Sequence, residues 1–295
     1  MFSGVHTAII TPMRNGLIDF DALAALVERQ IDGGVDGIVP CGTTGESATM
    51  RDEEIVDVIR RTVEIVAGRC LVTAGVGTNN TARTIDLAKR AVSVGADAGL
   101  VITPYYNKPG QEGLYQHCAA VAEAVSELPI MLYNVPGRTA VAFSVDTVSR
   151  LAEISNVVAL KEASADLAYA SEIVSRCGEE LTLLSGDDVT ALPMWAIGGQ
   201  GVVSVTSNLV PTRMAALWRA FSMGDFESAR QMHLDLVPLF NGMFLETNPV
   251  PVKALVAAST GLCGDEVRLP LTPLTEQGRA RLTAICNRLE IGLEA

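Results

Sequence analysis

Eight short apolar runs alternate with amphipathic helical segments along the first three quarters of the chain, and this alternation is the feature that most constrains the fold. The runs lie at residues 7–12, 37–42, 70–77, 98–106, 129–136, 157–164, 181–188 and 201–208. The helical segments lie near 21–33, 52–67, 81–94, 113–126, 144–154, 167–177, 190–197 and 211–222. Eight buried strands, each followed by a helix, are typical of an α/β fold with a parallel (β/α)8 barrel, the TIM barrel. We predict this barrel over residues 1–224.

The rest of the chain, residues 225–295, has helical patterns and no clear strand. Its clearest pieces are "DFESARQMHLDLVPLF" and "TEQGRARLTAICNRLEIGL". We predict a C-terminal helical region that packs on the barrel.

Charge and composition exclude several classes of partner. The formal net charge is -12, which repels nucleic-acid phosphate and anionic membranes. The six cysteines lack zinc-site spacing, no GxGxxG follows a strand, and the three histidines have no partner spacing, so we expect neither a metal nor a dinucleotide cofactor. No apolar run reaches the ~18 residues of a membrane span, and the N-terminal segment is typical of a strand and not of a signal peptide. We therefore expect a cytoplasmic protein.

Lys161 ends the apolar run "VVAL" and is the first candidate for chemistry. Burying an ammonium group is costly, so such a lysine needs a partner or a purpose. The other lysines, Lys89, Lys108 and Lys253, are expected on a solvated helix face, in a loop and in a helix. A desolvated lysine has a lowered pKa, and its neutral amine can attack a ketone. The alternative is an ion pair with Glu162 or another carboxylate.

The segment "CGTTGES", residues 41–47, follows the second strand. Its two threonines lie in a tight glycine turn that can offer N–H groups and hydroxyls to a carboxylate or phosphate. The alternative is an ordinary loop that caps a helix, since Thr49 and Asp52 have the spacing of a capping box. The segment lacks the GxxxxGK[ST] pattern of a nucleotide P-loop.

Two further strand ends carry aromatic and basic residues. In "YNVPGRT", Tyr133 could carry a proton and Arg138 could pair with a substrate carboxylate. A packed aromatic and a surface ion pair are the alternatives. In "TPYYNKP", Tyr105 and Tyr106 should point in different directions, one toward a pocket and the other toward a neighbouring chain; simple aromatic packing is the alternative.

Together these motifs resemble those of the dihydrodipicolinate synthase family, pyruvate-dependent class I aldolases within the N-acetylneuraminate lyase superfamily. "GTTGE", the strand-end "KE" and the "YN" are shared across the superfamily, whereas "TPYYNKP" and "YNVPGRT" are specific to the synthase branch. "LSGDD" and "SVTSN" also match. The resemblance runs from Gly4 to at least Leu271.

The resemblance implies four catalytic residues. Lys161 corresponds to the lysine that forms an imine with pyruvate, so no cofactor is implied. Tyr133 corresponds to the tyrosine that assists imine formation and later proton transfer. Thr44 corresponds to the threonine that links this tyrosine to Tyr106 of a neighbouring subunit.

The resemblance also implies a set of substrate-binding residues. Thr43 and Thr44 correspond to the site for the pyruvate carboxylate, and Arg138 to the residue that binds the carboxylate of the aldehyde. Gly186 corresponds to a position whose carbonyl faces the pocket, and Val203 is assigned to the same set. A homo-oligomer is implied, at least a dimer and commonly a tetramer.

The reaction implied is the lyase-type condensation of pyruvate with L-aspartate 4-semialdehyde in diaminopimelate and lysine biosynthesis. A sister aldolase that acts on a 2-keto-3-deoxy sugar acid or a sialic acid is the alternative, and Arg138 with the tyrosine pair argues against it. A barrel that has lost catalysis and serves as a binding protein is a third reading.

Many family members are inhibited by lysine near the dimer interface. An acidic residue of that site corresponds here to Arg83, and two histidines of some members correspond to Asp52 and Ile55. An arginine should repel the ammonium of the ligand, so we expect weak or absent inhibition by lysine. The remaining residues that match this site are Ser47, Ala48, Asn79 and Tyr105.

Overall fold

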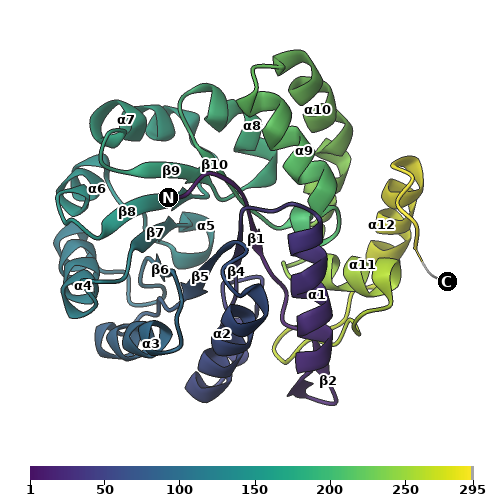
Figure 1. Cartoon of the computed structure of the whole chain (residues 1–295), viewed down its shortest axis with the longest axis horizontal. Coiled ribbons are helices and arrows are strands. Elements are labelled where there is room, and N and C mark those ends of the chain that lie inside the picture. Colours follow the sequence, from purple (N-terminus) through teal and green to yellow (C-terminus); the bar gives the residue numbers. More distant parts are fainter. Residues whose placement is uncertain (294–295) are drawn as a thin grey trace.

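Eight parallel strands close into a barrel in the computed structural model, which describes residues 1–293 (Figure 1). Around the barrel the order is β1-β10-β9-β8-β7-β6-β5-β4. The predicted (β/α)8 fold is confirmed. The strands are β1 Gly4–Ala8, β4 Gly37–Val39, β5 Leu71–Gly75, β6 Ala98–Ile102, β7 Ile130–Asn134, β8 Val157–Glu162, β9 Thr182–Ser185 and β10 Gly201–Ser204.

A helix follows each barrel strand and covers its outer side, as the alternation predicted. Most helices begin at a side-chain cap; Asn80, for example, accepts a hydrogen bond from the N–H of Arg83 at the start of α3. The helices are α1 Phe20–Asp32, α2 Asp52–Val66, α3 Thr81–Ser93, α4 Gln111–Ala124, α6 Val145–Ala152, α7 Leu167–Cys177, α8 Asp188–Ala196 and α9 Pro211–Ser222.

The first strand lies earlier than the apolar run at residues 7–12 predicted. β1 ends at Ala8, and its pairing with β10 runs from Gly4 opposite Gly201 to Thr7 opposite Ser204. His6 and Thr7 are polar but buried in this strand, which hid its beginning. The apolar residues that follow Ala8 are also buried, but in a segment that leaves the barrel.

Several short elements have no counterpart in the sequence-based prediction. A two-stranded ribbon, β2 Met13–Arg14 with β3 Leu17–Ile18, precedes α1. Three single turns follow strand ends: η1 Ser47–Thr49, α5 Pro136–Thr139 and η2 Thr206–Asn208. Such turns are too short to give a periodic signal in the sequence.

The predicted C-terminal helices are present as α10 Phe226–Gly242, α11 Val250–Thr260 and α12 Glu276–Arg288. α10 packs against α8 and α9, and α12 contacts α10 and α11. In Figure 1, α11 and α12 lie on the same side of the view as α1 and away from α3, α4 and α6. The last two residues of the predicted region, 294–295, lie outside the described residues.

Two apolar cores stabilise the barrel. The larger one lies between the strands and the surrounding helices. The smaller one fills the interior of the barrel, and its buried members are Phe2, Ala8, Val39, Ala98, Leu100, Met131, Tyr133, Val135, Ala159, Leu184 and Val203. A packed interior leaves only the ends of the barrel for a site. Among the helices within residues 1–293, none combines the length and apolarity that a membrane crossing requires.

Candidate active site

Lys161 points into the barrel from the C-terminal end of β8. Side chains alternate along a strand, and Ala159 belongs to the interior core whereas Leu160 belongs to the outer core. Lys161 therefore faces inward and Glu162 outward. The lysine is only 5% exposed, as expected for a strand-end residue above a packed interior.

The carboxylate next to Lys161 does not pair with it. Glu162 accepts a hydrogen bond of 2.7 Å from Nδ2 of Asn134, and the N–H of Ser164 donates to its other oxygen. Burial raises the pKa of Glu162. Within residues 1–293 the lysine that forms an ion pair is Lys253 and not Lys161. The ion-pair alternative for Lys161 therefore finds no support among residues 1–293.

Tyr133 is an aromatic neighbour of this amine. Tyr133 and Lys161 are direct register partners on β7 and β8, so both point inward. Nζ of Lys161 lies 4.1 Å from the centre of the tyrosine ring. The tyrosine is buried, so packing holds the ring against the lysine. This arrangement places a phenol beside a primary amine at the mouth of the barrel.

Gly186 lies against the other side of the lysine, directly after β9. A Cβ atom at this position would lie 3.0 Å from Cε of Lys161 and 2.7 Å from Cβ of Ala163. A glycine is therefore required for the lysine to keep its position. Val203 on β10 is fully buried in the interior core, so its side chain supports the floor of the site.

The loop after β4 brings Thr43 and Thr44 to the same end of the barrel. Thr43 lines a cavity, and Thr44 is buried with its Oγ1 accepting a hydrogen bond of 3.0 Å from Nδ2 of Asn248. The capping box proposed for Thr49 and Asp52 is wrong. Helix α2 begins at Asp52, and the first turn is closed by Glu54, which accepts from the N–H of Arg51.

A buried ion pair holds this loop from below. Nζ of Lys253, on α11, lies 2.5 Å from Oε1 of Glu46, and both side chains are 0% exposed. Oε2 of Glu46 accepts from the N–H of Arg268 at 3.2 Å. The helix predicted for Lys253 is confirmed, but its partner was missed, since the two residues are 207 positions apart.

The two adjacent tyrosines after β6 do point in different directions. Tyr105 lines the cavity, whereas Tyr106 is 89% exposed with a positive φ of 72°. A positive φ is uncommon for a bulky residue and indicates a conformation imposed by the loop. Lys108 lies in the same loop, as predicted, and Lys89 lies on the exposed face of α3, as predicted.

Arg138 extends from the short helix α5 toward the same mouth. Its Nη2 donates to the backbone oxygen of Asn248 at 3.3 Å. No carboxylate pairs with Arg138 among the described residues, and Arg138 is one of the residues that line the cavity. The alternative of a surface ion pair therefore finds no support.

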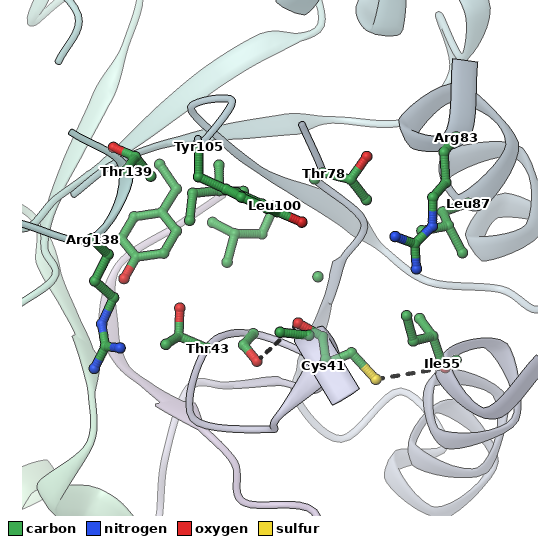
Figure 2. A pocket seen from close by; sticks show the side chains of 17 residues that line it. Cys41, Thr43, Ile55, Thr78, Arg83, Leu87, Leu100, Tyr105, Arg138 and Thr139 are labelled. Carbon is green, nitrogen blue, oxygen red and sulfur yellow. Dashed lines mark hydrogen bonds between the residues drawn. The ribbon is translucent and has the colours of Figure 1, made fainter. Parts of the chain in front are cut away.

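A cavity of about 220 Å³ lies at this end of the barrel. Figure 2 shows Arg138 and Thr139 on one side of it and Arg83 and Leu87 on the other. Cys41 lines its floor and donates to the carbonyl of Ile55 at 3.6 Å. The cavity therefore connects the candidate residues Tyr133, Thr43 and Arg138 with the candidate regulatory residues. Lys161, Thr44 and Gly186 are not among the residues that line it.

Arg83 does not face this cavity as a free cation. Its Nε and Nη2 both donate to Oδ1 of Asp52, at 2.9 and 2.7 Å. The pairing raises the pKa of Arg83. The other residues of the predicted regulatory set are close by: Ser47, Ala48 and Tyr105 line the cavity, and the carbonyl of Asn79 accepts from Asn107 beside it.

The three histidines take structural positions. His6 is fully buried, and burial lowers its pKa to about 4. Nδ1 of His117 lies 2.9 Å from Oγ1 of Thr81. His233 is buried against Phe240.

Asn248 is the residue of the site that the sequence did not reveal. It contacts both Thr44 and Arg138, and it lies two residues before α11. Its only local signal is the Asn-Pro pair, which indicates a turn and no particular function.

A (β/α)8 barrel with a buried lysine beside a tyrosine at its strand ends, the lysine having no carboxylate partner within residues 1–293, defines a class of barrel proteins suited to imine chemistry. The particular family follows from comparison with known proteins: the chain belongs to the dihydrodipicolinate synthetase family, whose model matches residues 1–289.

Three relatives cover almost the whole chain. The 4-hydroxy-tetrahydrodipicolinate synthase of Geotalea uraniireducens is 53% identical over 99% of this chain and 100% of its own length. The crystal structure of dihydrodipicolinate synthase from Aquifex aeolicus superimposes with a TM-score of 0.97 at 45% identity, and covers 100% of both chains. The chloride-inhibited dihydrodipicolinate synthase from Acinetobacter baumannii, complexed with pyruvate, has a TM-score of 0.96 at 42% identity, with 99% of this chain and 100% of that chain covered.

Proposed function

We propose that this protein is a 4-hydroxy-tetrahydrodipicolinate synthase, which condenses pyruvate with L-aspartate 4-semialdehyde. Relatives about half identical over the full length have this name, and one related structure holds pyruvate. The observation that carries the proposal is the buried amine of Lys161 beside Tyr133, which no carboxylate pairs with in the part of the chain that the structure describes. A biosynthetic enzyme of this kind acts in the cytoplasm.

The reaction begins when the amine of Lys161 attacks the ketone carbon of pyruvate and water leaves to form an imine. Loss of a methyl proton gives the enamine. The enamine carbon attacks the aldehyde carbon of the second substrate and forms the new C–C bond. The amino group of that substrate then attacks the imine carbon and displaces the lysine, which closes the ring and frees the enzyme.

Each step moves a proton, and the residues around Lys161 fit this task. Tyr133, in register with the lysine, exchanges protons with the hydroxyl that leaves as water. Thr44 joins the hydroxyl of Tyr133 to that of Tyr106 from a neighbouring subunit. The barrel interior below the site is apolar, which keeps water away from the imine.

Two anionic groups need separate positions. The loop that carries Thr43 and Thr44 offers N–H groups and hydroxyls to the carboxylate of pyruvate. Arg138 lies at the mouth with no carboxylate of its own among the described residues, so its guanidinium can take the carboxylate of the aldehyde bidentately. The carbonyl of Gly186 completes the pocket beside the lysine.

The proposed role of Tyr106 requires an oligomer, at least a dimer, and a dimer of dimers is the commonest closed arrangement beyond it. Its support is that Tyr106 is 89% exposed in the single chain while its neighbour Tyr105 faces the cavity. Tyr106→Phe should reduce kcat at least about 10-fold and leave pyruvate binding and the sedimentation coefficient unchanged. An unchanged kcat would remove this role.

The test of the function is pyruvate consumption by the purified protein, with and without L-aspartate 4-semialdehyde. Loss of pyruvate that depends on the aldehyde is the expected result. Borohydride reduction with pyruvate alone should add one pyruvate-derived group to Lys161, detected by mass spectrometry of peptides. Lys161→Ala should give no adduct, and Lys89→Ala, on the exposed face of α3, should give the wild-type yield.

The results of these two experiments distinguish the synthase from a sister aldolase and from a barrel without imine chemistry. An adduct without consumption in the presence of the aldehyde would indicate a sister aldolase with another acceptor. No adduct at Lys161 would contradict the imine mechanism altogether.

A further inference from the structure

Asn248 connects two residues of the proposed site from outside the barrel. Its Nδ2 donates to Oγ1 of Thr44 at 3.0 Å, and its backbone oxygen accepts from Nη2 of Arg138 at 3.3 Å. The residue is only 4% exposed. It lies beyond the last barrel helix, so the C-terminal region contributes directly to the mouth of the barrel.

The chemistry of the contact with Thr44 sets a direction. A hydroxyl has one proton to donate and two lone pairs that accept, whereas an amide nitrogen only donates. When Nδ2 of Asn248 donates to Thr44, the threonine oxygen is used as an acceptor, and its single proton remains free. In the proposed mechanism that proton is available to a tyrosine hydroxyl.

We propose that Asn248 is a positioning residue, which fixes the direction of the hydrogen-bond chain that passes through Thr44. The inference rests on the proposed function, because it assigns Thr44 to the link between Tyr133 and Tyr106. With Asn248 in place, Thr44 donates its one proton to one tyrosine hydroxyl and accepts from the other tyrosine and from the amide. Without it, the threonine hydroxyl can turn its proton to other acceptors and interrupt the chain.

The side-chain oxygen of Asn248 decides whether the hydrogen bond with Thr44 could run in the opposite direction. Oδ1 of Asn248 is buried and has no hydrogen-bond partner among residues 1–293. A half-turn of the amide would bring this oxygen to Thr44 and make the threonine the donor. The two orientations of the amide therefore predict opposite effects on kcat when residue 248 is replaced by an aspartate, which only accepts hydrogen bonds.

A second contact holds the segment that contains Asn248 against the loop that contains Thr44. Lys253, five residues after Asn248, forms an ion pair with Glu46, which lies two residues after Thr44. Both side chains are fully buried. Glu46 also accepts from the backbone N–H of Arg268. The loop and the segment before α11 are thus joined at two neighbouring points, and the amide of Asn248 is held at a fixed distance from Thr44.

The test is a double-mutant cycle between residues 248 and 44, measured as kcat in the intact oligomer. Asn248→Leu keeps the branched shape and removes both hydrogen-bonding groups. It should reduce kcat about 10-fold in the wild-type background and less than about 2-fold in the Thr44→Val background, because its effect passes through the threonine hydroxyl. Equal reductions in both backgrounds would show a merely structural role and overturn the proposal.

Asn248→Asp tests the direction of the hydrogen bond to Thr44. It also gives a result if the Asn248→Leu variant folds poorly. An ionised carboxylate accepts but does not donate, so it should turn the proton of Thr44 away from the tyrosines. We expect a larger loss of kcat than for Asn248→Leu. A smaller loss would mean that shape alone, or the opposite direction of the chain, is what matters.

Two controls complete the design. Thr247→Asp adds the same charge one residue away on an exposed side chain, so it reports the effect of charge on the KM values for the two anionic substrates. Borohydride trapping with pyruvate is repeated on every variant. If the wild type forms no adduct, the proposed function has failed; if it forms one and the cycle is additive, only the role of Asn248 has failed.

Discussion

Nζ of Lys253 lies 2.5 Å from Oε1 of Glu46, and neither side chain is exposed to solvent. Removal of one member of such a pair leaves a buried charge without compensation, which destabilises a protein by about 3–5 kcal/mol. Lys253→Met should lower the free energy of unfolding by this amount, measured by chemical denaturation. Lys89→Met, on the exposed side of α3, should change it by less than about 0.5 kcal/mol.

The matching double variant, Glu46→Gln with Lys253→Met, removes both charges at similar volume. It should recover most of the lost stability, because hydrophobic and neutral replacements of a whole buried pair are often tolerated. If the single and double variants are equally unstable, packing and not charge is what Lys253 contributes.

Gly186 should not tolerate even one methyl group. In Gly186→Ala the new Cβ would meet Cε of Lys161 at 3.0 Å and Cβ of Ala163 at 2.7 Å. A displacement of about 1 Å at a reacting group can cost about 100-fold in rate, and overpacking costs about 1–3 kcal/mol of stability. Imine formation with pyruvate should therefore slow strongly. Gly292→Ala, where a Cβ meets nothing within 4 Å, should leave it unchanged.

Arg138→Ala should separate the two substrates. Loss of a charged hydrogen-bond donor costs about 1.5–3 kcal/mol, which corresponds to about 10-fold to 100-fold in the KM for the aldehyde. The KM for pyruvate and the borohydride-trapped adduct should change little, since the pyruvate carboxylate is assigned to another loop. A variant that forms no adduct would place Arg138 in the first step and contradict its role at the entrance.

Inhibition by L-lysine should be weak or absent. The cavity beside the candidate site presents Arg83, held by Asp52, where an ammonium ligand needs a carboxylate. Because Arg83 already occupies the carboxylate of Asp52, that carboxylate is not free to bind the ammonium of the ligand. A titration of initial rates with L-lysine measures this. Strong inhibition below about 1 mM would contradict the prediction.

The buried His6 makes stability depend on pH. Burial lowers its pKa from 6.5 to about 4, so between these values the unfolded chain binds more protons than the folded one. Stability is therefore fully present above pH 6.5 and is lost as the pH falls toward 4. At ~1.4 kcal/mol per pH unit this amounts to about 3 kcal/mol. His6→Gln should flatten this part of the curve of unfolding free energy against pH; an unchanged slope would assign it to carboxyl groups.

The barrel could be predicted from the sequence because parallel strands are buried on both faces and leave continuous apolar runs. The same reasoning misplaced the first strand, where the buried polar residues His6 and Thr7 hide the pattern and the apolar run continues past Ala8. The position of Lys161 was predictable, since a charged residue at the end of such a run is itself the signal.

The partners of the site loop were not predictable in the same way. Asn248 and Thr44 are 204 positions apart, and the contact depends on how the C-terminal segment folds back over the barrel. Nothing local distinguishes Lys253 from an ordinary helical lysine, although it lies in an apolar stretch. Contacts of this kind become visible only when the whole chain is folded.

The junction between the loop and the C-terminal segment also bears on how the enzyme matures. All eight strands and the amine of Lys161 precede residue 205 in the chain, yet Glu46 receives its cation only when Lys253 has been synthesised. Until Lys253 is present, the loop that carries Thr44 therefore holds the carboxylate of Glu46 without its cation. The order of the chain thus places the cation that compensates this loop after every strand of the barrel.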